Sequence, residues 1–343
     1  IKKLDLSNNI KLEKIEDYTH QVSVCYKCKS TIEPLPRAQW FVKMTTKPKN
    51  GKKSLRDLAI EAVKTKKVIF ISKKFEKVFY HWMKNIRDWN ISRQIIWGIP
   101  IPIYYCEKCG KEIVYIKEGQ PKKCPHCGYN KFIKETDVFD TWFSSGQWPY
   151  ATLNFPHGKD FKKFYPTDVM ETGWDILFFW VARMIMFGMY TTGKAPFKYV
   201  YLHGLIRDKD RQKMSKSKNN VIDPLGIIDL YGADALRFSL IVNNAPGNDP
   251  IISEEKIRGY RNFTNKIWNA SRFVLMNLND FDKNNKPRLS KNDKEILKNL
   301  EKLVKDVTKD MDNFNFHIAS EKLYQYFWHV FADKIIEQNK SRL

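Results

Sequence analysis

The sequence predicts an α/β fold, with a parallel sheet in the middle of the chain and an α-helical bundle at its end. Two observations predict this arrangement. A strand, a buried helix and a second strand follow one another between residues 166 and 202, which is the βαβ pattern of a parallel sheet. After Pro224 the apolar residues recur every three or four positions, as they do in packed helices.

The composition indicates a globular protein that binds a polyanion. The 343 residues are 43% hydrophobic, enough for two or three domains, and carry 60 Lys and Arg against 38 Asp and Glu. A nucleotide or a nucleic acid would suit the net charge of +22, although a lysine-rich composition alone would also produce it. We expect no membrane span, because the longest apolar run, residues 176–190, is interrupted by Arg183 and is shorter than the roughly 20 residues required. We also expect the protein to be cytoplasmic and monomeric.

The first part of the chain is polar and then becomes helical. Cys25 and Cys28 form a single pair with only His20 nearby, so free thiols are the default interpretation and a metal site is the alternative. Residues 54–65 have the spacing of an amphipathic helix that Ser54 can cap. A second helix is expected over residues 75–86, and its inward residues are Phe79, Trp82 and Met83.

Two Cys-x2-Cys pairs separated by fourteen residues predict a metal knuckle within residues 104–130. Each pair is followed by glycine, which permits the tight turn of a knuckle. Four thiolates suit tetrahedral zinc and leave no open position, so the ion would be structural. Two disulfides are the alternative, but nothing in the sequence suggests secretion. The four ligands would be Cys106, Cys109, Cys124 and Cys127.

The start of the helix at residues 174–190 has the residues of a nucleotide site. Gly173 would let a ligand approach the backbone, and Asp175 could accept hydrogen bonds from two ribose hydroxyls close to the positive end of the helix. An acidic residue in a first helical turn is also favourable without any ligand. The lysine-rich loop after the next strand favours the nucleotide, because ligands bind at the carboxyl ends of strands in half of a Rossmann-type domain such as this.

The next strand, residues 197–202, leads to His203 and Gly204 and then to that loop. His203 could contact the nucleotide or could be an ordinary loop histidine. Lysine ammonium groups three residues apart can surround a polyphosphate, whereas the alternative is a solvated Lys/Ser loop. The loop residues are Lys213, Met214, Ser215, Lys216 and Ser217.

Several strings together resemble the class I aminoacyl-tRNA synthetases, and within that class the valyl enzymes. Ser144 favours valine, because isoleucyl enzymes more often have aspartate at that position. The matching strings are Asp140-Thr141-Trp142-Phe143-Ser144-Ser145, Tyr201-Leu202-His203-Gly204, Lys213-Met214-Ser215-Lys216-Ser217, residues 220–224, residues 231–237 and residues 265–273.

The resemblance implies that L-valine and ATP, with Mg²⁺, form valyl-adenylate, and that the valyl group then passes to tRNA(Val). Lys213 and Lys216 would hold the β- and γ-phosphates, and Gly173 and Asp175 would hold the ribose. Trp142 and Trp180 would face each other across the amino-acid pocket. From the residues alone, Trp142 could instead be an ordinary core tryptophan.

The resemblance also implies a division of the chain. Residues 1–35 would be the remnant of an editing insertion, residues 36–250 the C-terminal half of the catalytic domain, and residues 251–343 the start of the anticodon-binding domain. A His-x-Gly-His element is absent from the sequence, so we expect a fragment that is inactive alone. Asn219 stands where the family usually has glycine. The alternatives are an isoleucyl-type enzyme and a non-catalytic tRNA-binding paralogue.

Overall fold

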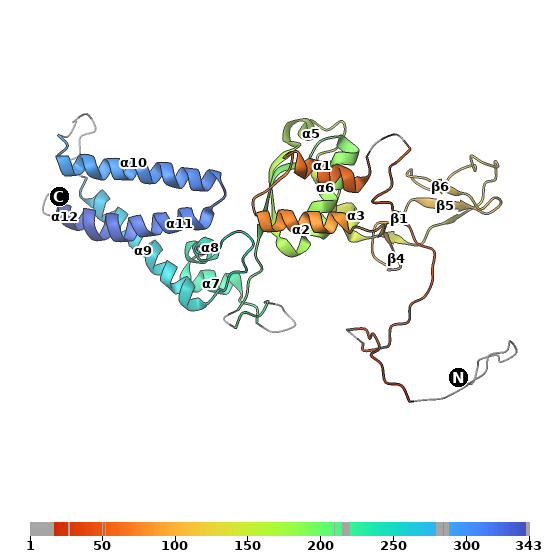
Figure 1. The fold of residues 1–343 in the computed structure, drawn as a ribbon, viewed down its shortest axis with the longest axis horizontal. Helices are drawn as coiled ribbons and strands as arrows, with labels where there is room; N and C mark the ends of the chain where they lie inside the picture. Colours follow the sequence, from red (N-terminus) through yellow and green to blue (C-terminus); the bar gives the residue numbers. More distant parts are fainter. Residues whose placement is uncertain are drawn as a thin grey trace. The chain divides into compact units, whose positions relative to one another are not determined.

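The computed structural model describes residues 17–26, 28–49, 51, 53–208, 210–214, 220–278, 284 and 288–340. The chain divides into two compact units, Ile1–Trp40 and Phe41–Leu343. The described part of the first unit contains a turn closed by a bridge between Val24 and Thr31. The sheets and helices belong to the second unit (Figure 1).

The strands in the described part of the second unit are short, and two of them have seven residues. They are β1 (Phe41–Val42), β2 (Ile69–Phe70), β3 (Trp89–Asn90), β4 (Ser92–Arg93), β5 (Ile103–Cys106), β6 (Glu112–Val114), β7 (Phe132–Lys134), β8 (Val138–Phe139), β9 (Thr167–Gly173) and β10 (Phe197–His203). The helices before residue 200 are α1 (Leu55–Lys64), α2 (Lys73–Lys84), α3 (Thr141–Ser145), α4 (Trp148–Ala151), α5 (Lys159–Phe164), η1 (Trp174–Ile176), η2 (Leu177–Val181) and α6 (Ala182–Thr192). The later helices are α7 (Pro224–Tyr231), α8 (Ala233–Ile241), α9 (Glu254–Met276), α10 (Lys291–Asp312), α11 (Phe316–Gln325), η4 (Tyr326–Ile336) and α12 (Glu337–Asn339).

A three-stranded parallel sheet in the order β2-β10-β9 confirms the predicted βαβ unit. Val200 and Leu202 of β10 are almost completely buried, as expected of a strand in the centre of a sheet. The register pairs Leu202 with Thr172 and His203 with Gly173, so β9 and β10 end side by side. This edge is where the sequence predicts the nucleotide site.

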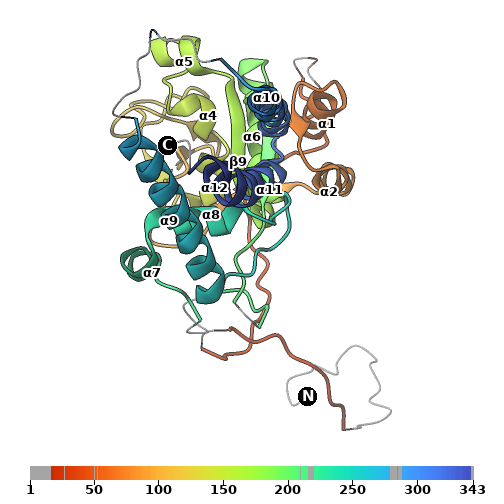
Figure 2. The ribbon, with the colours of Figure 1, turned by 90° about the vertical axis from the view of Figure 1, so that its left-hand side faces the viewer.

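Helices α1 and α6 pack against each other, and α2 lies next to β2 (Figure 2). Ser54 caps α1 as predicted, since its hydroxyl accepts the amide of Asp57 at 3.2 Å. Phe79 and Met83 of α2 are fully buried as predicted, but the expectation for Trp82 is wrong because its side chain is 46% exposed. Trp82 instead stacks on Phe178, with ring centroids 4.7 Å apart.

The segment after β9 is not the single regular helix that was expected. It begins as a 3₁₀ turn (η1), widens to a π-helix (η2) and becomes α-helical only at Ala182. The wider turn lets Phe178 contact Trp82 while Phe179 stacks on Trp142. Single π-turns inside helices are often found at functional sites. The helix ends at Gly193 in the left-handed conformation, with φ of 74°, as the glycine predicted.

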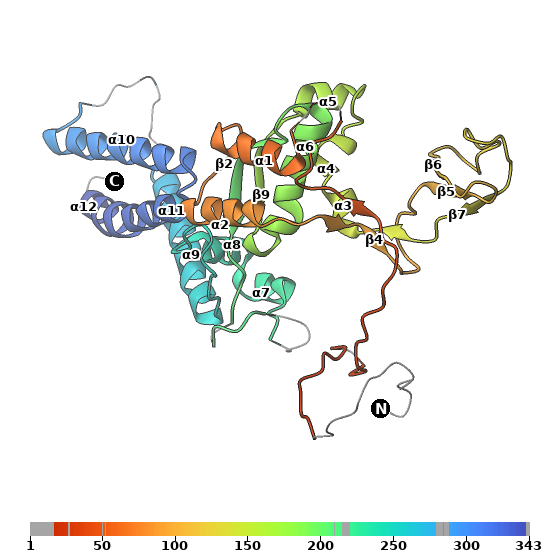
Figure 3. The same cartoon turned by 45° about the vertical axis from the view of Figure 1, so that its right-hand side comes forward.

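The cysteine-bearing segment forms a small antiparallel sheet in the order β6-β5-β7 (Figure 3). Cys106 is the last residue of β5, and the two turns that carry the cysteines follow β5 and precede β7. Gly110 and Gly128 have φ of 67° and 74°, so both turns use the left-handed conformation that glycine adopts without strain.

The last part of the chain is helical: α10 lies beside α11 (Figure 1), while α9 packs against α8 and η4. Ser290 and Asp293 form the predicted capping box of α10. Aromatic contacts join this part to the sheet: Tyr199 of β10 lies 5.1 Å from Phe314 and Tyr201 lies 5.6 Å from Phe316, measured between ring centroids. Among the described residues, no helix is both long and apolar enough to cross a membrane.

Candidate active site

The predicted nucleotide residues meet at the carboxyl ends of β9 and β10. The ammonium nitrogen of Lys213 lies 3.6 Å from a carboxylate oxygen of Asp175, although the two residues are far apart in the sequence. Both side chains are partly exposed, at 57% and 37%, so they can reach a ligand as well as each other. Gly173 is tightly enclosed, since a Cβ there would lie 2.9 Å from Asp175 Oδ1 and 3.6 Å from His203 Cε1.

Lys213 is held by a hairpin that starts after β10. Lys213 pairs with Arg207 in an antiparallel bridge, and the amide of Met214 donates to the carbonyl of Ile206 at 3.4 Å. The carboxylate of Asp208 accepts the amides of Asp210 and Gln212 and so fixes the turn. Ser215, Lys216, Ser217 and Asn219, which the sequence analysis singled out, lie outside the described residues.

His203 and Gly204 occupy the end of β10. The His203 ring shares a hydrogen bond through Nδ1 with the Gly204 carbonyl at 2.7 Å, and its Nε2 lies 3.4 Å from Glu171 Oε1. Gly204 has no room for a side chain, because a Cβ would lie 1.8 Å from the Asn248 carbonyl oxygen. The chain therefore needs glycine here for close packing.

Sequence reasoning missed Asp249, which joins the elements around this edge. Its carboxylate accepts the indole N–H of Trp174 at 2.9 Å and the amide of Leu205 at 2.8 Å, and it forms an ion pair with Arg207 at 2.6 Å. Burial alone would raise the pKa of this carboxyl, but these donors lower it overall. No residue pattern connects Asp249 to these partners, because the chain contacts itself there across more than forty residues.

The two tryptophans predicted to line the amino-acid pocket are both attached to α3. Trp142 belongs to α3 and stacks on Phe179, with ring centroids 5.8 Å apart. The indole N–H of Trp180 donates to the carbonyl of Ser145, the last residue of α3, at 2.9 Å. Trp142 lines a cleft of about 580 Å³ together with Trp82, Trp89 and Phe178, and Trp180 is not among the described residues that line it.

The four predicted metal ligands come together. Their sulfurs all lie within 4.8 Å of one another, and the pairs Cys106–Cys127 and Cys109–Cys124 are 3.5 and 3.7 Å apart. Tetrahedral zinc–thiolate bonds of about 2.3 Å require sulfurs about 3.8 Å apart, which is close to these values. All four cysteines are free thiols rather than disulfides, so the cluster could hold one metal ion.

The first turn favours the thiolate form of Cys106, which is the form that a metal binds. Burial raises the pKa of the Cys106 thiol, but the amides of Cys109 and Lys108 donate to its sulfur and lower the pKa overall to about 7. The Tyr129 amide lowers the pKa of Cys127, yet burial and the neighbouring sulfurs raise it overall to about 12. A metal ion binds thiolates, so binding to this cluster would release the protons that remain on the thiols.

Cys25 and Cys28 lie on a turn with the same geometry as the two knuckles. The Cys25 amide donates to the Ser30 carbonyl and the Lys29 amide donates to the Cys25 carbonyl, and Lys29 has φ of 61° where the knuckles have glycine. The Cys28 sulfur contacts the Ser30 hydroxyl at 3.4 Å. No third or fourth ligand joins this pair within the described residues.

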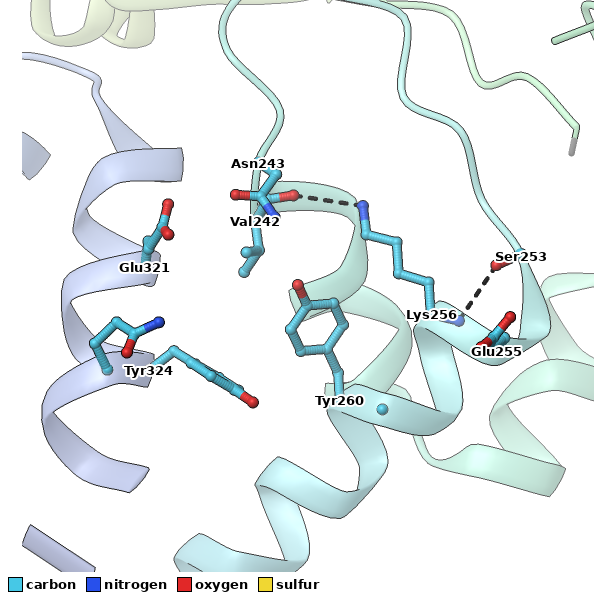
Figure 4. A pocket seen from close by; sticks show the side chains of 10 residues that line it. Val242, Asn243, Ser253, Glu255, Lys256, Tyr260, Glu321 and Tyr324 are labelled. Carbon is cyan, nitrogen blue, oxygen red and sulfur yellow. Dashed lines mark hydrogen bonds between the residues drawn. The ribbon is translucent and has the colours of Figure 1, made fainter. Parts of the chain in front are cut away.

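A second cavity of about 520 Å³ lies between α8, α9 and α11 (Figure 4). The rings of Tyr260 and Tyr324 meet edge to face in its wall, with centroids 6.2 Å apart. Lys256 donates to the Val242 carbonyl at 3.4 Å, and burial lowers the pKa of its ammonium group. None of the site residues predicted from the sequence lines this cavity.

The chain belongs to the class I tRNA synthetases. The family described as tRNA synthetases class I (I, L, M and V) matches residues 8–253, and the anticodon-binding domain of tRNA ligase matches residues 293–343. The first match covers most of the chain and includes Gly173, Asp175 and Lys213.

Within this family, similar proteins are valine–tRNA ligases. The valine–tRNA ligase of Clostridium acetobutylicum is 48% identical over 337 residues, covering 97% of this chain and 37% of the relative. That of Thermotoga maritima is 47% identical over 340 residues, covering 99% of this chain and 38% of the relative. The chain therefore spans little more than a third of the length of these relatives.

Two solved structures share the fold. A methionyl-tRNA synthetase of Mycobacterium tuberculosis bound to methionyl-adenylate aligns with a TM-score of 0.64 and 18% identity, over 88% of this chain and 54% of that chain. A ternary complex of LeuRS, tRNA and LeuAMS from Agrobacterium radiobacter aligns with a TM-score of 0.58 and 24% identity, over 75% of this chain and 39% of that chain.

Proposed function

We propose that this chain is the part of a valine–tRNA ligase that carries half of the ATP site and one wall of the amino-acid pocket. The observation that carries the proposal is the 3.6 Å approach of Lys213 to Asp175 at the end of a parallel sheet. About half of its residues are identical to those of valine–tRNA ligases, and this similarity supports valine as the amino-acid substrate. The reaction joins L-valine to ATP as valyl-adenylate and then transfers the valyl group to tRNA(Val).

Each residue of the site would have a role that suits the chemistry of its side chain. Asp175 would accept the ribose hydroxyls beside Gly173, and His203 with Gly204 would border the same nucleotide. Lys213 and Lys216 would neutralise the β- and γ-phosphates as the valine carboxylate attacks the α-phosphorus, while Met214, Ser215 and Ser217 complete the loop. Such positioned charges act mainly by stabilising the transition state. Mg²⁺ would accompany ATP, and Trp142 and Trp180 would contact the valine side chain.

Zinc is the metal we propose for the four cysteines. Cys106, Cys109, Cys124 and Cys127 supply four soft thiolates at tetrahedral spacing, which zinc prefers. With four protein ligands the ion would stabilise the small sheet and take no part in catalysis. We also retain the division into residues 1–35, 36–250 and 251–343, the cytoplasmic location and the monomeric state as predictions.

A chimera tests the proposal, because this chain alone lacks the His-x-Gly-His element and is expected to be inactive. In the chimera, this chain takes the place of the aligned segment of the Clostridium acetobutylicum enzyme. ATP–pyrophosphate exchange by the chimera is then measured with each amino acid. We expect exchange with valine, and isoleucine should be disfavoured by about 10- to 200-fold. Preference for isoleucine would instead support the isoleucyl alternative.

The non-catalytic alternative gives a different result in the same experiment. A tRNA-binding paralogue would give a folded chimera that binds tRNA but exchanges no pyrophosphate with any amino acid. The chain by itself would then bind tRNA through its basic surface, with an affinity that falls steeply as salt is added. Valine-dependent exchange by the chimera would exclude this alternative.

A further inference from the structure

The charged residues beside Trp142 form a network that the proposed reaction does not use. Asp140 is 7% exposed, and its carboxylate caps α3 by accepting the amide of Trp142 at 2.7 Å. The same carboxylate forms an ion pair with the guanidinium of Arg93. Arg93 is itself fixed, because it also donates to the carbonyls of Asn90 and Ser92. These bonds hold the Arg93 guanidinium against Asp140.

A second arginine belongs to the network. Arg183 is 5% exposed, and its guanidinium carbon lies 3.5 Å from the ring centroid of Trp89. The guanidinium also lies 5.6 and 5.7 Å from the rings of Phe178 and Phe179. Two of its nitrogens have no hydrogen-bond partner within the described residues. Burial lowers the pKa of Arg183 to about 10, and Asp140 opposes this shift, so the arginine remains charged at neutral pH.

Both tryptophans of the proposed amino-acid pocket depend on the same short helix. Trp142 lies two residues after the Asp140 cap and stacks on Phe179, a ring that Arg183 also contacts. Trp180 is attached to the other end of α3 through Ser145. A helix of five residues has few hydrogen bonds of its own, so its cap largely determines where it lies.

We propose that Asp140 is a positioning residue for amino-acid recognition: paired with Arg93, it holds α3, while Arg183 supports Phe179 beneath Trp142, so that Trp142 and Trp180 take their places at the pocket. The inference rests on the proposed function only for the identity of the pocket. Asp140 lines the same cleft as Trp142 and would control how tightly the amino acid binds by placing the two tryptophans. A mainly structural role would instead weaken the whole protein without distinguishing valine from ATP.

The first test needs no enzymatic activity. The chain is labelled with fluorotryptophan, and the ¹⁹F resonances of Trp142 and Trp180 are assigned by substituting each with phenylalanine. Asp140→Asn should move both resonances and leave that of Trp268, which is 72% exposed in α9, unchanged. Asp137→Asn is the matched control, because Asp137 is equally buried and nearby but bonds to Gln94. Unchanged Trp142 and Trp180 resonances would overturn the proposal.

The second test measures recognition in the chimera. Asp140→Asn should raise the KM for the activated amino acid by about 10- to 100-fold, as expected for a small displacement of a pocket wall. The KM for ATP should stay within about twofold, because Lys213 and Asp175 are untouched. Equal rises in both KM values, or a change no larger than that of Asp137→Asn, would overturn the specificity role.

A further variant covers the case in which Asp140→Asn does not fold. Arg183→Met keeps most of the side-chain volume but removes the charge over Trp89, and it should give the same selective rise in KM. A selective rise for an amino acid other than valine would support the network while contradicting the proposed function. The absence of any selective rise in Arg183→Met would overturn the network.

Discussion

Asp249 shows how a single carboxylate holds the nucleotide edge of the sheet together. It bonds to Trp174 at the start of the helical segment, to Leu205 after β10 and to Arg207 in the lysine hairpin. Because these partners come from three elements, Asp249 fixes the hairpin that presents Lys213 relative to Asp175. A partly buried carboxylate with three donors is expected to contribute more to stability than one surface ion pair.

Replacing Asp249 by asparagine should therefore destabilise the chain in a pH-dependent way. The pKa of Asp249 is lower in the folded protein, so its stabilisation is complete above the ordinary carboxyl pKa of about 4 and is lost as the pH falls through the lower folded value. We expect a loss of about 2 kcal/mol at pH 7, measured by urea unfolding, and a much smaller loss near pH 3. An equal loss at both pH values would contradict this role.

Two glycines give a matched comparison. Gly204→Ala should be strongly destabilising, because the added Cβ would lie 1.8 Å from the Asn248 carbonyl oxygen. A Cβ added at Gly259 in α9 would instead meet no neighbouring atom within 4 Å. Gly259→Ala should stabilise the chain by about 0.5–1 kcal/mol, since alanine is the better helix former. Thermal unfolding of both variants tests this, and equal melting temperatures would contradict the packing described at Gly204.

At the residue scale, the sequence predicted the residues that would bind the nucleotide better than it predicted the residues that hold them in place. Asp175 and Lys213 could be predicted because their residue types and spacing suit a nucleotide, and the structure brings them together. Asp249 and Asp140 could not, since their partners lie far away in the chain. Arg183 did give a signal: a charge inside an apolar helix must find compensating contacts. The sequence could not identify them as the rings of Trp89, Phe178 and Phe179.

At the scale of the element, the small sheet β6-β5-β7 should depend on the zinc ion that we propose for its cysteines. It has three or four residues per strand, and two of its cysteines, Cys106 and Cys124, are buried. So small a core rarely folds without a disulfide or an ion. The four candidate metal ligands of this segment could be predicted from the sequence, because the spacing of the two Cys-x2-Cys pairs is typical of zinc knuckles.

Metal analysis of the purified chain should find one zinc ion in this sheet. Removal of zinc by a chelator, or Cys109→Ser, should abolish slow amide exchange in β5–β7 while leaving β9 and β10 protected, as measured by hydrogen exchange. Cys28→Ser provides the control, since Cys28 lies outside the cluster. Unchanged protection of β5–β7 without metal would contradict the structural role of the ion.

The helical segment after β9 shows what periodicity does not predict. Its apolar residues correctly indicated a buried helix, and Ala182–Met189 are buried. The 3₁₀ and π turns at its start could not be predicted, because they arise from contacts of Phe178 and Phe179 with rings in α2 and α3. Local propensity is a weak guide where tertiary contacts decide the turn.

At the scale of the whole molecule, an aromatic cluster joins the sheet to the helices. Tyr199 and Tyr201 of β10 contact Phe314 and Phe316, which lie in the corner between α10 and α11. Because β10 also ends in His203 and Gly204, this cluster lies on the same strand as the proposed nucleotide site. Sequence periodicity predicted the helices but not this attachment, which depends on residues more than a hundred positions apart.

The double substitution Phe314→Ala with Phe316→Ala should separate the two parts. We expect the unfolding of the chain to change from one calorimetric transition to two, because these ring contacts would no longer couple the helices to β10. Trp268→Ala, at an exposed position of α9, should keep one transition. A single transition in both variants would contradict the coupling.

The central claim is that Lys213 and Asp175 act on one ATP molecule, and a double-mutant cycle in the chimera tests it most directly. Lys213→Met and Asp175→Asn should each lower kcat/KM for ATP in pyrophosphate exchange by about 10²–10³. Residues that share a ligand are coupled by about 0.5–3 kcal/mol, so the double variant should lose clearly less than the product of the two single losses. Losses that multiply without coupling would contradict a shared site.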